Sequence, residues 1–246
     1  MNPPTTARLL QVWEQAAAAS TWTRPLRLLA ASDCDFEDAA ALPLGNRDAR
    51  LLQLQTALFG AELTFLADCP KCKQRLEWAV NSSEFQCSEN ASADSEHSVQ
   101  VNEFNLRFRL PNTHDVAAAA ACQTVEQARR LIFERCVLAL ECRGQNVRVE
   151  DAPEPIVAAA AQRMADADPV ADIELALSCP ACGHPWNAPF DVATHLWTEL
   201  NAWAQKRLEE VHLLASAYGW GEAEILQLSP ARRRYYLEAI SLCAIT

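Results

Sequence analysis

Apolar and polar residues alternate in two short segments of the chain, residues 62–68 and 172–178. This period-two pattern is typical of strands that are buried on one face. Each segment runs into a C-P-x-C motif, and after each motif a second stretch, at 76–80 and 185–190, suits a returning strand. The pattern therefore predicts two β-hairpins, each with two cysteines at its tip.

Most of the remaining chain has apolar residues at helical spacing. We expect helices over residues 5–31 with one interruption, 47–59, 113–122, 124–142, 153–166, 192–218, 222–228 and 230–242. Asn46 is expected to cap the helix that ends before Gly60. Residues 104–110 form the clearest further strand, 146–149 suit a brief one, and the polar, acidic stretch 87–97 suits a mobile loop.

These elements predict an α+β fold that is mainly helical. Cys72 and Cys179 enclose 106 residues, far more than the ~15–20 between the halves of a compact ribbon. We therefore interpret the hairpins as halves of a discontinuous four-cysteine zinc ribbon with a small α+β module inserted between them. The expected divisions are an N-terminal helical region (1–60), the first ribbon half (61–84), the inserted module (85–170), the second ribbon half (171–191) and a C-terminal helical region (192–246).

The four cysteines of the two motifs are the predicted metal ligands: Cys69, Cys72, Cys179 and Cys182. Two C-x-x-C motifs in matching context are a strong zinc signal, and four thiolates complete the tetrahedron of one structural Zn²⁺. A closed tetrahedron leaves no position for water or substrate. Two alternatives stay open: a pair of unrelated reduced thiol motifs, and a site in which His184 replaces a cysteine, which a metalloenzyme would need.

Composition and charge narrow the function classes. Half of the residues are apolar, 22% are charged and the net charge is −11, so the chain is globular and nucleic-acid binding is disfavoured. No apolar run suits a membrane span, and no signal peptide is recognisable at the N-terminus, so the ten cysteines are expected in a reducing, cytoplasmic setting. With six glycines and no catalytic constellation, no phosphate-binding loop and no enzyme activity are expected.

The predicted helix over 192–218 carries an apolar stripe at near-heptad spacing. The stripe comprises Trp197, Leu200, Ala204, Leu208, Val211, Ala215 and Tyr218. We expect it to pack in the core of this chain, with a seam for a partner helix as the alternative. Trp203 and Trp220 lie off the stripe and need burial elsewhere.

Arg232, Arg233 and Arg234 fall in the first turn of the last helix, where the helix dipole disfavours cations. They are expected to pair with acidic residues of neighbouring elements, of which the candidates are Glu209, Glu210, Glu222 and Glu224. An external acidic partner is the alternative, because arginine and tyrosine are frequent in protein–protein hot spots. The candidate partner-binding residues are Trp203, Trp220, Arg232, Arg233, Arg234, Tyr235 and Tyr236.

Residues 218–238, with the sequence YGWGEAEILQLSPARRRYYLE, closely resemble the C-terminal segment of a baseplate family. These are the baseplate hub assembly proteins of T-even-type contractile-tailed phages, which have relatives in bacterial contractile injection systems. Residues 42–48 and 177–186 also look like that family. The insert at 85–170 contributes little to the resemblance.

The resemblance implies a non-enzymatic structural or chaperone-like assembly component that binds baseplate or hub proteins of a contractile injection system. No small-molecule substrate and no membrane insertion are implied. Such a protein is made in the cytoplasm of the producing bacterium, and is either incorporated into the assembled particle or left behind. The alternative function is a nucleic-acid-associated zinc-ribbon accessory protein.

Overall fold

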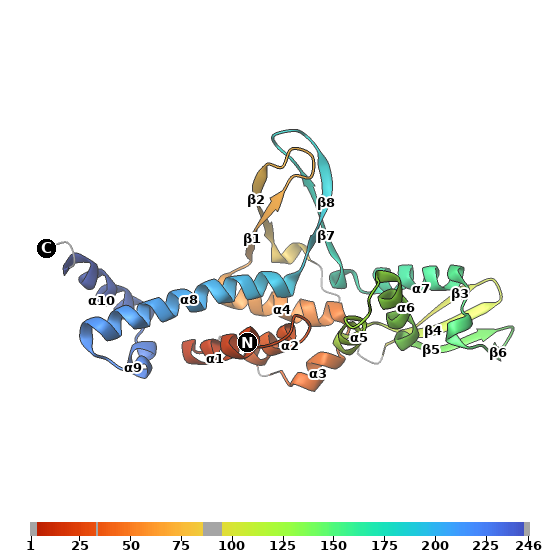
Figure 1. Cartoon of the computed structure of the whole chain (residues 1–246), viewed down its shortest axis with the longest axis horizontal. Helices are drawn as coiled ribbons and strands as arrows, with labels where there is room; N and C mark the ends of the chain where they lie inside the picture. Colours follow the sequence, from red (N-terminus) through yellow and green to blue (C-terminus); the bar gives the residue numbers. More distant parts are fainter. Residues whose placement is uncertain (1–3, 33, 86–94, 244–246) are drawn as a thin grey trace.

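A computed structural model describes residues 4–32, 34–85 and 95–243. The molecule is elongated and α+β, with helices predominating (Figure 1). Two hairpins project from a helical body near its middle, a sheet-containing module lies at one end, and the last two helices lie at the other (Figure 1). The described part of the chain has no helix that is both long and apolar enough to cross a membrane.

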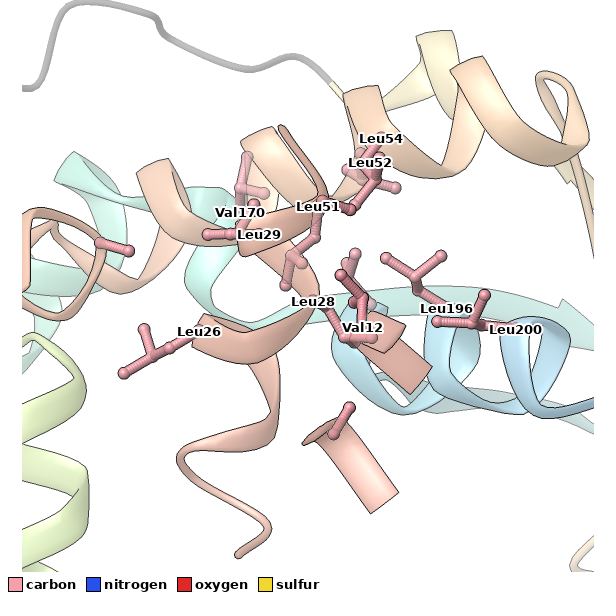
Figure 2. Close-up of a cluster of buried hydrophobic side chains, with 14 of the residues drawn as sticks. Val12, Leu26, Leu28, Leu29, Leu51, Leu52, Leu54, Val170, Leu196 and Leu200 are labelled. Atoms are coloured by element: carbon pink, nitrogen blue, oxygen red, sulfur yellow. The ribbon is translucent and has the colours of Figure 1, made fainter. Parts of the chain in front are cut away.

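The helical body joins both ends of the sequence in one hydrophobic core. Its helices are α1 (Thr6–Ala17), α2 (Arg24–Leu29), α3 (Phe36–Ala41), α4 (Leu44–Phe59) and α8 (Val192–Tyr218). Leu51 of α4 and Leu196 and Leu200 of α8 are almost fully buried in the same cluster (Figure 2). Val12 of α1 has no exposed surface there. The packing of α1 and α4 against α8 therefore joins the N-terminal helices directly to the first half of α8.

The start of α4 differs from the prediction that Asn46 caps it. The helix begins at Leu44, with Pro43 as its N-cap residue and no side-chain cap. Its free amides find partners in distant segments instead: Leu44 N–H donates to the carbonyl oxygen of Pro111 at 3.1 Å, and Gly45 N–H donates to Asp168 Oδ2 at 2.9 Å. Tertiary contacts thus satisfy the orphan donors that a capping side chain would otherwise take.

The predicted end of α4 is confirmed. Gly60 follows the helix with φ 102°, a conformation that favours glycine, and its N–H donates to the Thr56 carbonyl. The sequence reasoning missed α3, whose N-cap Asp35 accepts hydrogen bonds from the Glu37 and Asp38 amides.

The two predicted hairpins are confirmed as antiparallel pairs. The first joins β1 (Glu62–Asp68) to β2 (Arg75–Asn81), and the second joins β7 (Ile173–Ser178) to β8 (Pro185–Phe190). At the end nearest the body, Leu63, Ile173 and Phe190 are buried in the helical core. The far ends, which carry the cysteines, project away from it (Figure 1).

The segment between the two hairpins in the sequence forms a four-stranded sheet with its own hydrophobic cluster. The strands are β3 (Glu96–Val101), β4 (Phe104–Arg109), β5 (Val137–Cys142) and β6 (Gln145–Asn146), in that order across the sheet. The helices of this segment are α5 (Thr113–Ala119), α6 (Val125–Cys136) and α7 (Glu154–Ala167). Short 3-10 turns complete the chain: η1 (Ala30–Ser32), η2 (Ser82–Glu84), η3 (Val149–Asp151) and η4 (Pro169–Ala171).

The prediction of a helix through residue 142 is wrong in its last six residues. Helix α6 ends at Cys136, and β5 then pairs with β4, placing Leu140 opposite Leu106 and Val137 opposite Phe108. Both Leu106 and Phe108 are fully buried. Pairing with β4 and packing on these side chains therefore favour a strand over the helix that the local spacing of apolar residues predicts. The predicted loop over 87–97 lies mostly outside the described residues, and its last two residues belong instead to β3.

Helix α8 spans the predicted range, and Gly219 ends it in a left-handed conformation with φ 70°. The predicted core stripe is only partly correct. Leu200 and Ala204 are buried, but the buried row runs at four-residue spacing and resumes only at Leu214, whereas Leu208 and Tyr218 are exposed. Beyond Ala204 the helix leaves the main core and leads to α9 (Glu222–Gln227) and α10 (Pro230–Cys243), as Figure 1 shows.

Candidate metal centre

The tip of the first hairpin is closed by a turn that points backbone amides at a sulfur. Cys69 N–H donates to the Gln74 carbonyl at 3.0 Å, and Lys73 N–H returns to the Cys69 carbonyl at 2.9 Å. Lys73 has φ 62°, so the residue after the second cysteine is left-handed. This conformation turns the chain sharply enough for both thiols to face one point.

The second tip repeats this turn position by position. Cys179 N–H donates to the His184 carbonyl at 3.0 Å, and Gly183 N–H donates to the Cys179 carbonyl at 2.8 Å. Gly183 has φ 68° and occupies the place of the left-handed lysine in the first tip. Two local turns of the same geometry therefore present their four sulfurs toward each other.

The four sulfurs form a compact group. The Sγ atoms of Cys69 and Cys182 lie 3.7 Å apart, as do those of Cys72 and Cys179. All four lie within 4.8 Å of one another. A tetrahedral metal site with metal–sulfur bonds of about 2.3 Å has edges of about 3.8 Å, whereas a disulfide requires about 2.05 Å. The donor set and its spacing therefore fit one tetrahedral metal ion and no disulfide.

The pKa values of the thiols show that the four sulfurs cannot all be ionised without a compensating positive charge. Desolvation raises the pKa of Cys69, but the amides of Cys72 and Lys71 and the adjacent thiols outweigh it and lower the pKa to about 7. For Cys182 the His184 amide lowers the pKa, yet desolvation and the three other sulfurs raise it to about 12. Four thiolates at this spacing repel one another, and a bound cation removes that repulsion.

His184 is not among the ligand atoms of this cluster. Its contribution is through the backbone, because its carbonyl accepts from Cys179 and its amide faces the Cys182 sulfur. Cys69 and Cys179 are buried, Cys182 is half-buried and Cys72 is exposed. The other described thiols, those of Cys34, Cys122, Cys136 and Cys142, do not join the group, and Cys87 and the Cys243 side chain lie outside the described residues.

Aromatic side chains hold the two hairpins against each other below the sulfurs. Trp78 of β2 meets Trp186 of β8 edge to face, with ring centroids 6.1 Å apart. Nearer the body, Phe190 contacts Phe65 at 5.7 Å and stacks on Phe85 at 5.6 Å. The sequence reasoning did not assign these contacts, although Phe65, Trp78, Trp186 and Phe190 fall within the predicted strands; Phe85 lies outside them and follows η2. The hairpins are thus joined at the tip by sulfurs and along their length by rings.

The candidate partner-binding tryptophans and arginines fall in four different environments. Trp203 packs against the helical core, and Trp220 stacks on Tyr218 with centroids 4.7 Å apart. Arg233 is buried and forms an ion pair with Glu210 at 3.0 Å, one of the expected internal partners. Arg232 and Arg234 are exposed, and their guanidinium groups have no partner among the described residues.

The fold and the site define a mainly helical protein in which a four-cysteine centre links two hairpins that are far apart in the sequence. A family model described as T4 bacteriophage base plate protein matches residues 28–194, which is well over half of the chain. The chain belongs to this family. No curated protein and no solved structure matches the chain. The matched segment contains both cysteine turns and the module between them, while most of α8 and all of α9 and α10 follow it.

Proposed function

We propose that this chain is a non-enzymatic structural or assembly component of the baseplate of a contractile tail or injection system, where it binds other baseplate or hub proteins. The observation that carries the proposal is the family match over residues 28–194. The earlier resemblance to hub assembly proteins makes a chaperone-like role during assembly the more specific form of the proposal.

The proposed cofactor is one Zn²⁺ held by Cys69, Cys72, Cys179 and Cys182. Four sulfurs are the ligand set of structural zinc, and their separations match its tetrahedral geometry. With four protein ligands no coordination position is left for a substrate or water, so the metal would brace the hairpins and take no part in a reaction. This supports a binding protein in preference to a metalloenzyme.

The proposal is tested by co-expression of the tagged chain with the tube, hub and wedge proteins of its own tail gene cluster. Stable co-purification with at least one baseplate subunit, through size-exclusion chromatography, is the expected result. Immunodetection in purified particles then separates the two roles, since a resident component is present in the particle and an assembly chaperone is absent. Failure to bind any of these subunits contradicts the proposed function.

A further inference from the structure

One buried carboxylate ties α10 to α8, and it lies between two guanidinium groups. Glu210 Oε2 is 3.0 Å from Arg233 Nε and 2.8 Å from Arg207 Nη1. The three side chains are between 6% and 18% exposed. Two positive charges thus share one negative charge, and neither Arg207 Nε nor Glu210 Oε2, both buried, has a hydrogen bond of regular geometry among the described residues. The base of α10 carries an excess of positive charge.

The outer side of the same helix adds to this excess. Arg232 and Arg234 flank the buried Arg233, are exposed, and pair with no described carboxylate. They lie in the first two turns of α10, a helix of 14 residues, where the helix dipole is also positive. No carboxylate of the described residues forms an ion pair with either guanidinium, although the exposed Glu238 lies one turn after Arg234 on α10.

An exposed aromatic edge adjoins these arginines. Tyr235 is 69% exposed and meets Tyr236 edge to face at 5.7 Å. Tyr236 in turn packs on Trp220 at 4.9 Å and on Tyr218 at 5.6 Å. The packed rings of Tyr218, Trp220 and Tyr236 hold the exposed ring of Tyr235 in place, so this ring is already positioned for contact with a partner. Rigid tyrosine beside arginine is a frequent composition of protein-binding hot spots.

We propose that Arg232, Arg234 and Tyr235 form a docking surface for an acidic segment of another protein, an inference that rests on the proposed binding function. The partner chemistry follows from charge complementarity, because the exposed guanidinium groups of Arg232 and Arg234 present positive charge beside Tyr235. Two exposed arginines neutralise too few phosphates for stable nucleic-acid binding. An acidic protein segment therefore suits the surface better than DNA or RNA.

The test uses two fluorescein-labelled ten-residue peptides that differ only in charge. One contains five glutamates among leucine and tyrosine, and in the other each glutamate is replaced by glutamine. Fluorescence anisotropy with the full chain is expected to show at least a tenfold preference for the glutamate peptide, reduced by high salt. The double variant Arg232→Gln/Arg234→Gln is expected to lose that preference, and Tyr235→Ala is expected to weaken binding of both peptides.

The matched control is Arg129→Gln/Arg163→Gln, which removes the same charge from exposed positions on α6 and α7. It is expected to bind like the wild type. No preference for the glutamate peptide, or a preference that survives in Arg232→Gln/Arg234→Gln, overturns the inference. A labelled ten-nucleotide single strand is measured in the same assay. If it binds more tightly than the glutamate peptide, and if this binding needs Arg232 and Arg234, the inference is overturned in favour of a nucleic-acid partner.

The proposed function fails separately from this inference. If the wild type and Arg232→Gln/Arg234→Gln co-purify equally well with baseplate subunits, the docking surface is wrong and the baseplate role stands. If neither co-purifies while the peptide preference holds, the baseplate role is contradicted and the acidic-segment surface is retained.

Discussion

The Sγ atoms of Cys69 and Cys182 lie 3.7 Å apart although the two cysteines are 113 positions apart along the chain. Each belongs to a different hairpin, so a metal ion bound by all four sulfurs cross-links segments on either side of the inserted sheet. Because α1, α4 and α8 already share one hydrophobic core, this cross-link acts chiefly on the hairpins. Loss of the metal is therefore expected to loosen the two hairpins while the helical body stays together.

Replacing Cys179 by serine is expected to open the hairpin tips without dispersing the helices. Structural zinc contributes on the order of 10–16 kcal/mol in small metal-dependent domains, and the change removes one of its ligands. Amide hydrogen exchange should accelerate in β1, β2, β7 and β8 while α4 and α8 keep their protection. Cys122→Ser, at a thiol outside the cluster, is the control and should exchange like the wild type. Unchanged protection of the hairpins in Cys179→Ser contradicts the cross-link.

Helix propensity alone predicts that Gly45→Ala stabilises the protein, whereas the close approach of Asp168 to Gly45 predicts that it destabilises it. An added Cβ at Gly45 would meet Asp168 Oδ1 at 1.7 Å, so Gly45→Ala should lower stability by about 1–3 kcal/mol although alanine is the better helix former. At Gly221 the nearest atom is Glu224 Oε2 at 3.7 Å, which leaves room for the methyl group. Urea denaturation of Gly45→Ala and Gly221→Ala checks the pair, and equal stabilities would rule out the close approach.

The buried carboxylate of Asp115 makes the stability of the inserted module depend on pH. Desolvation raises the pKa of Asp115, but its ion pairs with Arg109 at 2.6 Å and Arg135 at 2.8 Å and the Asn112 amide hold the pKa below its ordinary value of 3.8. Since the folded pKa is below the unfolded one, this contribution is complete above pH 3.8 and is lost as the pH falls through the folded pKa.

Asp115→Ala is therefore expected to cost about 3–5 kcal/mol at neutral pH, because it leaves two guanidinium groups without their buried partner. The gap between the wild type and the variant should narrow below pH 3.8. Glu96→Ala is the control, since its ion pair with Arg107 is about half exposed and contributes at most about 1 kcal/mol. Chemical denaturation across pH measures both, and a gap that widens in acid would refute the assignment.

Arg233 and Arg234 are neighbours with opposite predicted behaviour. Arg233 forms the buried ion pair that fixes α10 on α8, whereas Arg234 is exposed without a described partner. Arg233→Ala should expose α10 to rapid cleavage by thermolysin because it removes the ion pair that joins α10 to Glu210 of α8. Arg234→Ala should leave the cleavage rate at the wild-type value. Equal rates for the two variants would show that the ion pair does not hold the helix.

The cysteine turns were predictable because their signal is local. A C-P-x-C motif between two alternating segments specifies both the strands and the turn, and the hairpins appear at the predicted positions. Helix ends marked by glycine, at Gly60 and Gly219, were recognised for the same reason, since only the backbone conformation of one residue is needed.

What the sequence did not reveal depends on partners far away in the chain. Residues 137–142 have helical spacing, and become a strand because β4 offers a pairing edge and two buried side chains. Helix α4 begins before Asn46 because Pro111 and Asp168 accept its first amides. The choice between an internal and an external partner for the arginine run was likewise settled for Arg233 by the fold of α10 onto α8.

The metal content of the purified chain tests the central claim most directly. Protein prepared under reducing conditions without added chelator, and measured by plasma mass spectrometry against a chain concentration from amino-acid analysis, should contain one zinc ion per chain. The variants Cys69→Ser and Cys182→Ser, each at one end of the 3.7 Å contact between hairpins, should both contain much less. A wild-type chain without stoichiometric metal, or full zinc content in either variant, would contradict the four-sulfur cross-link.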